Sequence, residues 1–181
     1  KSKMKRENDM GMSGQNNVIE KMKKAAGAMQ SDLMRIRREL HRHPELGMEL
    51  PETHEIISRE LRKIPGLQVY EHRAGDSGII AVMRGGKGAG KTVLMRADID
   101  ALPIEEKTDR GYRSMNPGRM HACGHDGHAA WLVGAAKLLS LTREEWGGCI
   151  KFVFQPGEEI GKGADILIGE DKVLEDPPVD M

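Results

Sequence analysis

The chain has 181 residues, and its 28 Lys and Arg residues balance its 28 Asp and Glu residues, so the formal net charge at pH 7 is zero. Surfaces that bind nucleic acid need a basic excess, so this balance argues against a nucleic-acid partner. No apolar run reaches the length of a membrane span, and the first residues lack the apolar centre of a signal peptide. We therefore expect a cytoplasmic protein with one ordinary core and no membrane partner.

The N-terminal region divides into a polar segment and a helix. Residues 1–17 are polar and show no hydrophobic period, which predicts a disordered leader. From about Val18 the pattern becomes helical, with Leu33 and Leu40 on one apolar face. Pro44 should end this helix, because the residue before a proline avoids the α region.

Strands and helices alternate over the rest of the chain. Apolar and β-branched runs predict strands, whereas apolar residues at a spacing of three to four predict helices. The expected strands are residues 67–71, 78–84, 92–97 and 149–154, and the expected helices are residues 51–64, 129–141 and 164–168. This alternation indicates an α/β sandwich.

Residues 85–92, GGKGAGKT, match the phosphate-binding loop pattern letter for letter. That loop needs a strand before it and a helix after it, so that backbone amides and the helix N-terminus face phosphate. A strand is expected before residue 85, but the residues after Lys91 are strand-like. We therefore expect a Gly-rich hairpin, and a nucleotide-binding protein is the less favoured alternative.

Potential metal ligands are concentrated in residues 120–128, MHACGHDGH. Cysteine thiolate and imidazole nitrogen suit a borderline divalent ion such as zinc, and an aspartate can bind the ion or orient a histidine. Gly124 and Gly127 let the backbone bend closely around an ion. This segment therefore predicts a metal site.

Carboxylates follow two of the expected strands. Glu158 and Glu159 come just after the last strand, and Asp98 and Asp100 follow the strand over residues 92–97. In α/β sheets, ligands collect at the C-terminal ends of the strands. A metal hydrolase needs ligands, an open position for water and a base, so one glutamate could bind metal while the other accepts the proton of water. Among the aspartates, we favour a site role for Asp98.

Other candidate residues are weaker. His41 and His43 lie near the end of the first helix, where the helix dipole favours histidine, so a site role and a structural role both stay open. His54 and His72 are expected to be ordinary surface histidines. Cys149, within an apolar strand, is expected to be a buried thiol.

Four segments together resemble a known family: residues 37–47 (RRELHRHPELG), 96–104 (RADIDALPI), 114–128 (SMNPGRMHACGHDGH) and 152–159 (FVFQPGEE). They resemble the M20 metallopeptidases, in particular the amidohydrolase branch that includes hippurate hydrolase, N-acyl-amino-acid amidohydrolase and indole-acetyl-amino-acid hydrolases. The resemblance implies an α/β fold, a mixed-sheet sandwich of the zinc aminopeptidase and carboxypeptidase type. Residues 18–181 would form the N-terminal part of its catalytic domain, without the lid domain.

The resemblance also implies roles for individual residues. The metal ligands would be Cys123, His125 and Glu159. Glu158 would be the general base, and the catalytic Asp98 would lie behind the metal. His128 and Asp126 would lie beside the ligands. Two divalent ions are implied, manganese or zinc, with cobalt or nickel as further options. The branch takes two more histidine ligands from later segments, so residues 1–181 alone are expected to be poorly active.

The function implied is cleavage of the amide bond of N-acyl amino acids such as hippurate, by metal-activated water with Glu158 as the base. The partner would be this small-molecule substrate, and a homodimer is conceivable for a longer form because the family's lid domain mediates dimers. The alternative is a truncated, non-catalytic relative.

Overall fold

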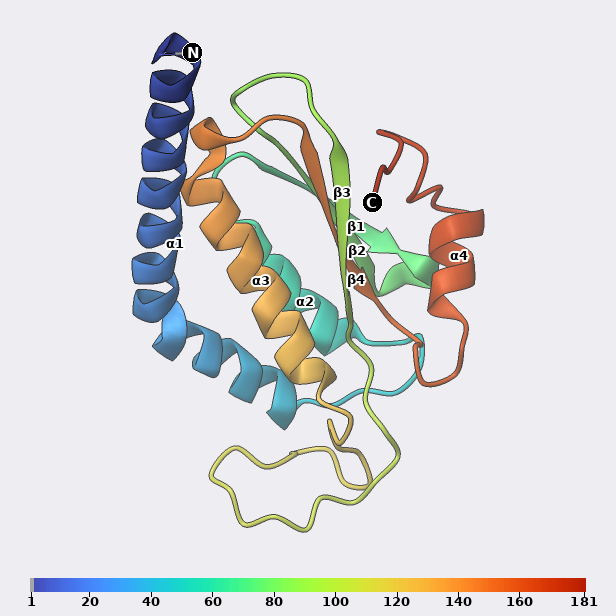
Figure 1. Cartoon of the computed structure of the whole chain (residues 1–181). Helices are drawn as coiled ribbons and strands as arrows, with labels where there is room; N and C mark the ends of the chain where they lie inside the picture. The colour runs from blue at the N-terminus through green and yellow to red at the C-terminus, as the bar shows by residue number, and fades with distance from the viewer. Residues whose placement is uncertain (1) are drawn as a thin grey trace.

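The computed structural model describes the backbone of residues 2–181 and the side chains from Asn16 onward. Its centre is a mixed sheet in the order β1-β2-β4-β3 (Figure 1). The strands are β1 (Leu67–Arg73), β2 (Gly78–Arg84), β3 (Thr92–Asp98) and β4 (Cys149–Gln155). β2 is antiparallel to both β1 and β4, whereas β3 runs parallel to β4. The α/β class and the mixed sheet expected from the sequence are confirmed.

Helices cover both faces of this sheet. On one face lie α2 (Pro51–Leu61) and α3 (His125–Leu141), with α1 (Ser2–Arg42) packed against α3 (Figure 1). The short α4 (Gly163–Gly169) lies on the other face, and the turns η1 (Ala74–Asp76) and η2 (Arg143–Glu145) complete the regular structure. The main core is formed between the sheet and the first three helices; its fully buried members include Ile36, Ile57, Val133, Phe152 and Phe154.

Helix α1 starts at Ser2, well before the expected start near Val18, and it ends at Arg42 as Pro44 predicted. The expected leader, residues 1–17, thus falls within the α1 backbone, except for Lys1, which lies outside the described residues. The side chains of residues 1–15 are not described, and the division of the chain at residue 18 stays a prediction.

The segment after β2 differs from the expected hairpin. β4 lies between β2 and β3, so residues 85–91 connect two strands that are not neighbours. The hairpin prediction was wrong because β4 takes a central position: Phe152, Val153 and Phe154 are all buried, so both of its faces are covered. Gly90 passes so close to this strand's start that an added Cβ would lie 2.8 Å from the amide nitrogen of Gly148.

Helix α3 starts earlier than the expected position at Ala129. It begins at His125 after Gly124, whose φ of +92° is open to glycine at little cost. Consequently His125, Asp126 and His128 lie on the first turn of a helix, where the backbone holds them in defined directions. Helix α2 ends at Leu61, a few residues before the expected end.

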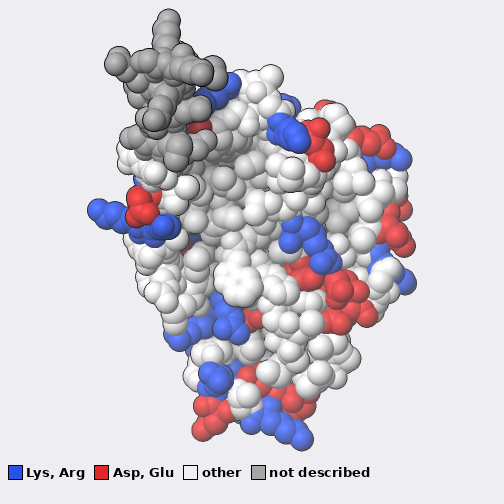
Figure 2. Space-filling model, viewed as in Figure 1, with Lys and Arg blue, Asp and Glu red and all other residues white. Residues whose placement is uncertain are grey.

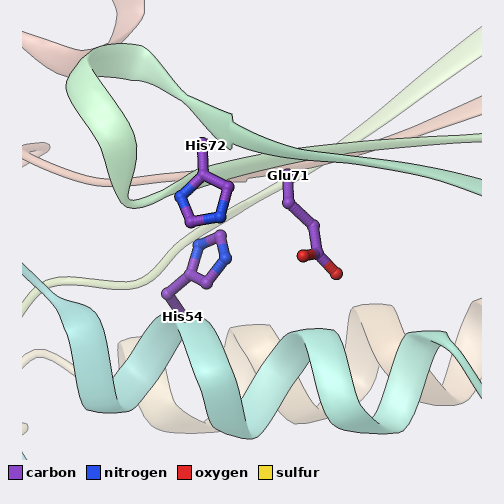
Figure 3. Close-up of side chains that lie close together, drawn as sticks. All are labelled: His54, Glu71 and His72. Atoms are coloured by element: carbon purple, nitrogen blue, oxygen red, sulfur yellow. The ribbon is translucent and has the colours of Figure 1, made fainter.

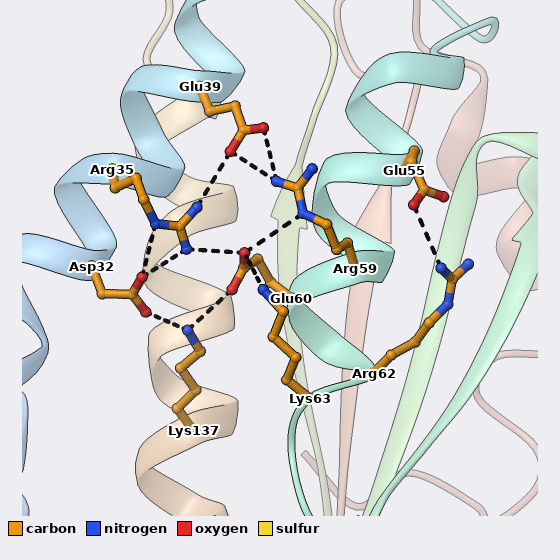
Figure 4. A network of polar contacts seen from close by, with 9 residues as sticks. All are labelled: Asp32, Arg35, Glu39, Glu55, Arg59, Glu60, Arg62, Lys63 and Lys137. Carbon is orange, nitrogen blue, oxygen red and sulfur yellow. Dashed lines mark hydrogen bonds and ion pairs between the residues drawn. The ribbon is translucent and has the colours of Figure 1, made fainter.

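A network of charged side chains joins α1, α2 and α3 (Figure 4). Glu60 of α2 is buried and contacts Arg35 of α1 at 2.9 Å, Lys63 at 2.9 Å and Lys137 of α3 at 3.4 Å. Lys137 also pairs with Asp32 of α1. Ion pairs therefore hold the three helices together beside the apolar core.

The outer surface carries both signs of charge. On the face shown in Figure 2, basic and acidic side chains are interspersed and separated by uncharged areas. Among the described residues, no helix combines the length and apolar character needed to cross a bilayer.

Candidate metal centre

The predicted ligands meet at the edge of the sheet where β3 and β4 end. The two strands are parallel, and the last residue of β3, Asp98, pairs in register with Gln155 of β4. The chain therefore leaves both strands at the same edge, with Asp100 on one side and Glu158 and Glu159 on the other. Helix α3 begins at this edge as well, because Nδ1 of its first residue, His125, lies 2.9 Å from the backbone oxygen of Asp100.

Cys123, His125 and Glu159 each offer one ligand atom, and the three atoms lie within 4.8 Å of one another. A thiolate, an imidazole and a carboxylate are ligands that zinc and similar divalent ions accept. His125 is buried, the side chain of Glu159 is 23% exposed and Cys123 is exposed, so solvent can reach the group. The donor set present thus fits a divalent metal ion with an open position.

His125 is oriented by its neighbours on both sides of the ring. Its Nδ1 lies 2.9 Å from the backbone oxygen of Asp100, so Nδ1 donates a proton and Nε2 keeps its lone pair. Nε2 faces Asp98 Oδ1 at 3.6 Å, Glu159 Oε1 at 3.7 Å and Glu158 Oε2 at 3.8 Å. Three carboxylates within 3.8 Å of one imidazole nitrogen create the negative potential that a cation needs.

Asp100 connects these segments, and the sequence alone did not assign it a role. Its carboxylate is fully buried and accepts the backbone amides of Glu158 and Glu159, both at 3.1 Å. Burial opposes ionisation, but hydrogen bonds from His125 and from these amides outweigh it and hold the pKa of Asp100 below its ordinary value. The sequence did contain one indication of a role for Asp100, because this residue follows the end of an expected buried strand. Asp98 lies at the end of the same strand, so position alone did not distinguish the two aspartates.

Asp98 and His128 lie next to the three candidate ligands. Asp98 Oδ1 is 2.7 Å from Nδ1 of His128, and its other oxygen accepts a bond from Arg96 at 2.9 Å. Asp98, His125 and His128 form a second group whose ligand atoms lie within 4.8 Å of one another. The structure therefore brings both residues to the ligand group. His128 is exposed and lies on the solvent side of this group.

Asp126, which was expected beside the ligands, makes its side-chain contacts across helices with α1. Its carboxylate is buried and bonds to His41 at 2.8 Å and Arg37 at 3.1 Å, both on α1. The hydrogen bond to Asp126 raises the pKa of His41, and the other ring nitrogen of His41 faces the buried Glu106 at 3.4 Å. Among the described contacts, Asp126 thus joins α3 to α1, and His41 is a buried bridge between two carboxylates.

His121, the first histidine of the ligand-rich segment, also stays apart from the three candidate ligands. Burial lowers its pKa to about 4, so the ring is neutral near pH 7. Among the described residues, neither ring nitrogen has a hydrogen-bond partner. The sequence did not predict that this histidine is buried.

The pKa of the Cys123 thiol lies above its ordinary value. Partial desolvation raises its pKa, and the nearby charges of Glu159, Glu158 and Asp98 raise it further. A bound divalent ion would reverse this balance, because a thiol that coordinates a metal is deprotonated. Cys149, in contrast, is a buried thiol within β4, as expected.

The phosphate-loop alternative is not supported by the geometry of residues 85–92. The amides of Gly85, Gly86 and Lys87 donate to the carbonyls of Gly148, Arg143 and Trp146, so they are not directed at a phosphate. The segment leads into β3 rather than into a helix. The backbone donors and the helix N-terminus that this loop requires are therefore both lacking in this segment.

Two expectations about histidines outside the centre had different outcomes. His72 is exposed, as expected, but His54 is buried, with 6% of its surface exposed. The expectation failed for His54 because its ring stacks on His72 of β1 and its Nδ1 lies against the backbone oxygen of Ser77. A further residue that the sequence analysis did not single out is Glu45, whose buried carboxylate accepts the amides of Glu52 and Thr53 at the start of α2.

A mixed α/β sheet that gathers thiol, imidazole and carboxylate groups at the C-terminal ends of its parallel strands defines a metallopeptidase-type fold. Comparisons with known proteins identify the family. Residues 94–181 match peptidase family M20/M25/M40. The chain therefore belongs to the M20 metallopeptidases, and its relatives lie in the amidohydrolase branch.

Among curated proteins, IAA-amino acid hydrolase ILR1-like 5 of Arabidopsis thaliana is 46% identical, covering 77% of this chain and 31% of that protein. N-acetyl-L-cysteine deacetylase of Bacillus subtilis is 44% identical, covering 84% and 34%. The crystal structure of the Bacillus subtilis YXEP protein, described as a dinuclear metal binding peptidase from the M20 family, superposes with a TM-score of 0.77 at 41% identity, covering 82% and 40%. The chain thus spans about a third of the length of these curated relatives.

Proposed function

We propose that the protein is a cytoplasmic metal-dependent amidohydrolase that cleaves the amide bond between an acyl group and an amino acid, with hippurate-like compounds as substrates. The observation that supports this most directly is the convergence of Cys123, His125 and Glu159 within 4.8 Å, with Glu158 beside them. Two relatives are named for the hydrolysis of acylated amino acids, which agrees with this substrate class.

In this proposal Cys123, His125 and Glu159 hold a divalent ion, and Asp98 and His128 lie beside a second one. Manganese or zinc fits this donor set, and cobalt or nickel would be accepted as well. When bound, a divalent ion acidifies water and stabilises the negative charge that develops on the amide oxygen. Asp100 keeps His125 in the tautomer with a free Nε2 and fixes the loop that carries both glutamates.

Glu158 acts as the general base. Its side chain is 40% exposed, and its Oε2 lies 3.8 Å from His125 Nε2, so it reaches both solvent and the ligand group. It takes a proton from the attacking water and returns this proton to the departing amine, which leaves as an amino acid. Glu159 is assigned to the ion in this proposal, so the proton goes to Glu158.

The test is Glu158→Gln in the intact protein, assayed for release of amino acid from N-acyl substrates and for metal content. The amide keeps the shape of the side chain but cannot accept the proton, so we expect a loss of about 100-fold or more in turnover at unchanged metal content. Glu170→Gln, an exposed glutamate after α4, is the matched control and should keep full activity. Near-normal turnover by Glu158→Gln would remove the proposed base, and absence of hydrolysis by the metal-loaded wild type would favour a non-catalytic relative.

A further inference from the structure

A second group of potential ligands lies outside the centre described above, between α2 and the edge strand β1. His54, Glu71 and His72 each offer one ligand atom, and the three atoms lie within 4.8 Å of one another (Figure 3). His54 comes from α2, whereas Glu71 and His72 come from the end of β1. We propose that these three residues form a second site for a zinc-class divalent cation, distinct from the amidohydrolase centre and not dependent on the proposed function.

The geometry of β1 explains how neighbouring residues come together. Successive side chains of a regular strand point to opposite faces, so Glu71 and His72 would normally diverge. Here the pairing of β1 with β2 shifts register between Tyr70 and Arg73, and His72 has a φ of +56°. An irregularity of this kind redirects a side chain, and it brings His72 back toward α2.

Both imidazole rings are held in the tautomer that binds a metal through Nε2. Nδ1 of His54 lies 3.2 Å from the backbone oxygen of Ser77, and Nδ1 of His72 lies 2.7 Å from Oδ1 of Asp76. In metal sites the second ring nitrogen is typically bonded to a carbonyl or carboxylate in this way. The lone pairs at Nε2 are thus left available.

His54 supplies an independent indication of a ligand. The residue is 6% exposed, and its Nε2 is buried without a hydrogen-bond partner among the described residues. A buried polar atom without a partner costs desolvation free energy, so native structures usually satisfy it. A cation shared with His72 and Glu71 would satisfy this nitrogen.

The surroundings favour a positive ion that solvent can reach. A surface cavity of about 530 Å³ borders the two histidines, and its lining also includes Glu49, Glu55 and Asp76. Two imidazoles, one carboxylate and a water complete the four positions that Zn²⁺ prefers. Arg62 shares the carboxylate of Glu71 through bonds of 2.8 Å to each oxygen, so it competes with the cation.

Binding requires a local movement of His72. The two rings now stack, with centroids 4.8 Å apart and planes inclined by 26°, whereas lone pairs that share an ion must point toward one point. The side chain of His72 is 63% exposed and can rotate without disturbing the core. The ion would then tie α2 to β1.

The experiment is a calorimetric Zn²⁺ titration of the Cys123→Ala chain, in which the other centre has lost its thiolate. His72→Ala added to this chain should weaken the remaining binding at least about tenfold, since an exposed ligand is removed without loss of core packing. His43→Ala is the matched histidine control and should leave the affinity unchanged. Arg62→Ala should increase the affinity, because it frees the carboxylate of Glu71.

Cadmium NMR gives a second readout that separates the two centres. ¹¹³Cd bound by nitrogen and oxygen resonates far from ¹¹³Cd bound by a thiolate, so the second site should appear as a signal that persists in Cys123→Ala and disappears in His72→Ala. Equal Zn²⁺ affinity with and without His72, or no rise in affinity for Arg62→Ala, would overturn the three-ligand site. Neither result bears on the amidohydrolase centre, which is tested by Glu158→Gln.

Discussion

The backbone oxygen of Asp100 accepts a hydrogen bond of 2.9 Å from Nδ1 of His125. This contact determines which ring nitrogen of His125 is free, and it joins the end of β3 to the first turn of α3. Because the carboxylate of the same aspartate accepts the amides of Glu158 and Glu159, one buried residue positions a histidine and two glutamates from separate segments.

Asp100→Asn is therefore expected to weaken metal binding by about 10- to 100-fold, the usual effect of losing a residue that orients ligands. Asparagine keeps the shape but has one oxygen where two amides are bonded, so the loop carrying Glu159 loses a fixed position. The measurement is a Zn²⁺ titration in competition with a chelator. Asp109→Asn, in an exposed loop, should behave as the wild type, and equal affinities for the two variants would contradict the role given to Asp100.

The second prediction concerns the pH dependence of metal binding. The pKa of the Cys123 thiol is raised by partial desolvation and by the neighbouring carboxylates, and the thiol must lose its proton to bind a cation. Metal affinity should thus increase as pH rises and fall as pH is lowered. Chelator competition at several pH values should show a shallower dependence for Cys123→Ser. Cys149→Ala, which removes the buried thiol of β4, serves as the control and should retain the full slope.

The third prediction tests the loop that carries the two glutamates. A Cβ added at Gly163 would overlap the backbone oxygen of Pro156, at the start of this loop. Gly163→Ala should reduce the free energy of unfolding by about 1–3 kcal/mol, as for other overpacked sites, and should weaken metal binding. Gly169→Ala, at the end of α4 with no atom near the added Cβ, is the control. Unchanged thermal stability of Gly163→Ala would show that the loop adapts.

The fourth prediction concerns acid stability. Burial alone would raise the pKa of Glu60, but hydrogen bonds from Lys63 and Arg35 outweigh it, so the pKa lies below the ordinary value of 4.5. A lowered carboxylate pKa stabilises the fold above the unfolded-state value, and this contribution is lost as pH falls through the folded-state pKa. Glu60→Gln should therefore reduce the free energy of unfolding by about 1–3 kcal/mol near pH 7.

As pH falls from 4.5 through the lower folded-state pKa, the difference between Glu60→Gln and the wild type should shrink, because the wild-type side chain then becomes protonated and neutral as well. Urea unfolding near pH 7 and in the range below pH 4.5 measures this difference in the free energy of unfolding. Glu55→Gln, whose exposed side chain pairs with Arg62 at 3.5 Å, should change stability by less than about 1 kcal/mol at either pH. A destabilisation of Glu60→Gln that is independent of pH would exclude the ionic explanation.

Local patterns in the sequence predicted most of the secondary structure. The bounds of β2 were predicted at Gly78 and Arg84, and Pro44 marked the end of α1, because hydrophobic period and proline act over a few residues. The ligand types Cys123, His125 and Glu159 could also be named, because their chemistry belongs to the side chains themselves. The structure then brought these three together, as the proposal requires.

Only the tertiary structure decided which segments are neighbours. The position of β4 between β2 and β3 depends on burial of both of its faces, and no local pattern in residues 85–91 reports this. Likewise, the role of Asp100, the contact of Asp126 with α1 and the meeting of His54 with Glu71 and His72 depend on distances between residues far apart in the chain. The sequence determined which groups are present, whereas packing of the helices and strands determined which of them meet, because burial is a property of the whole fold.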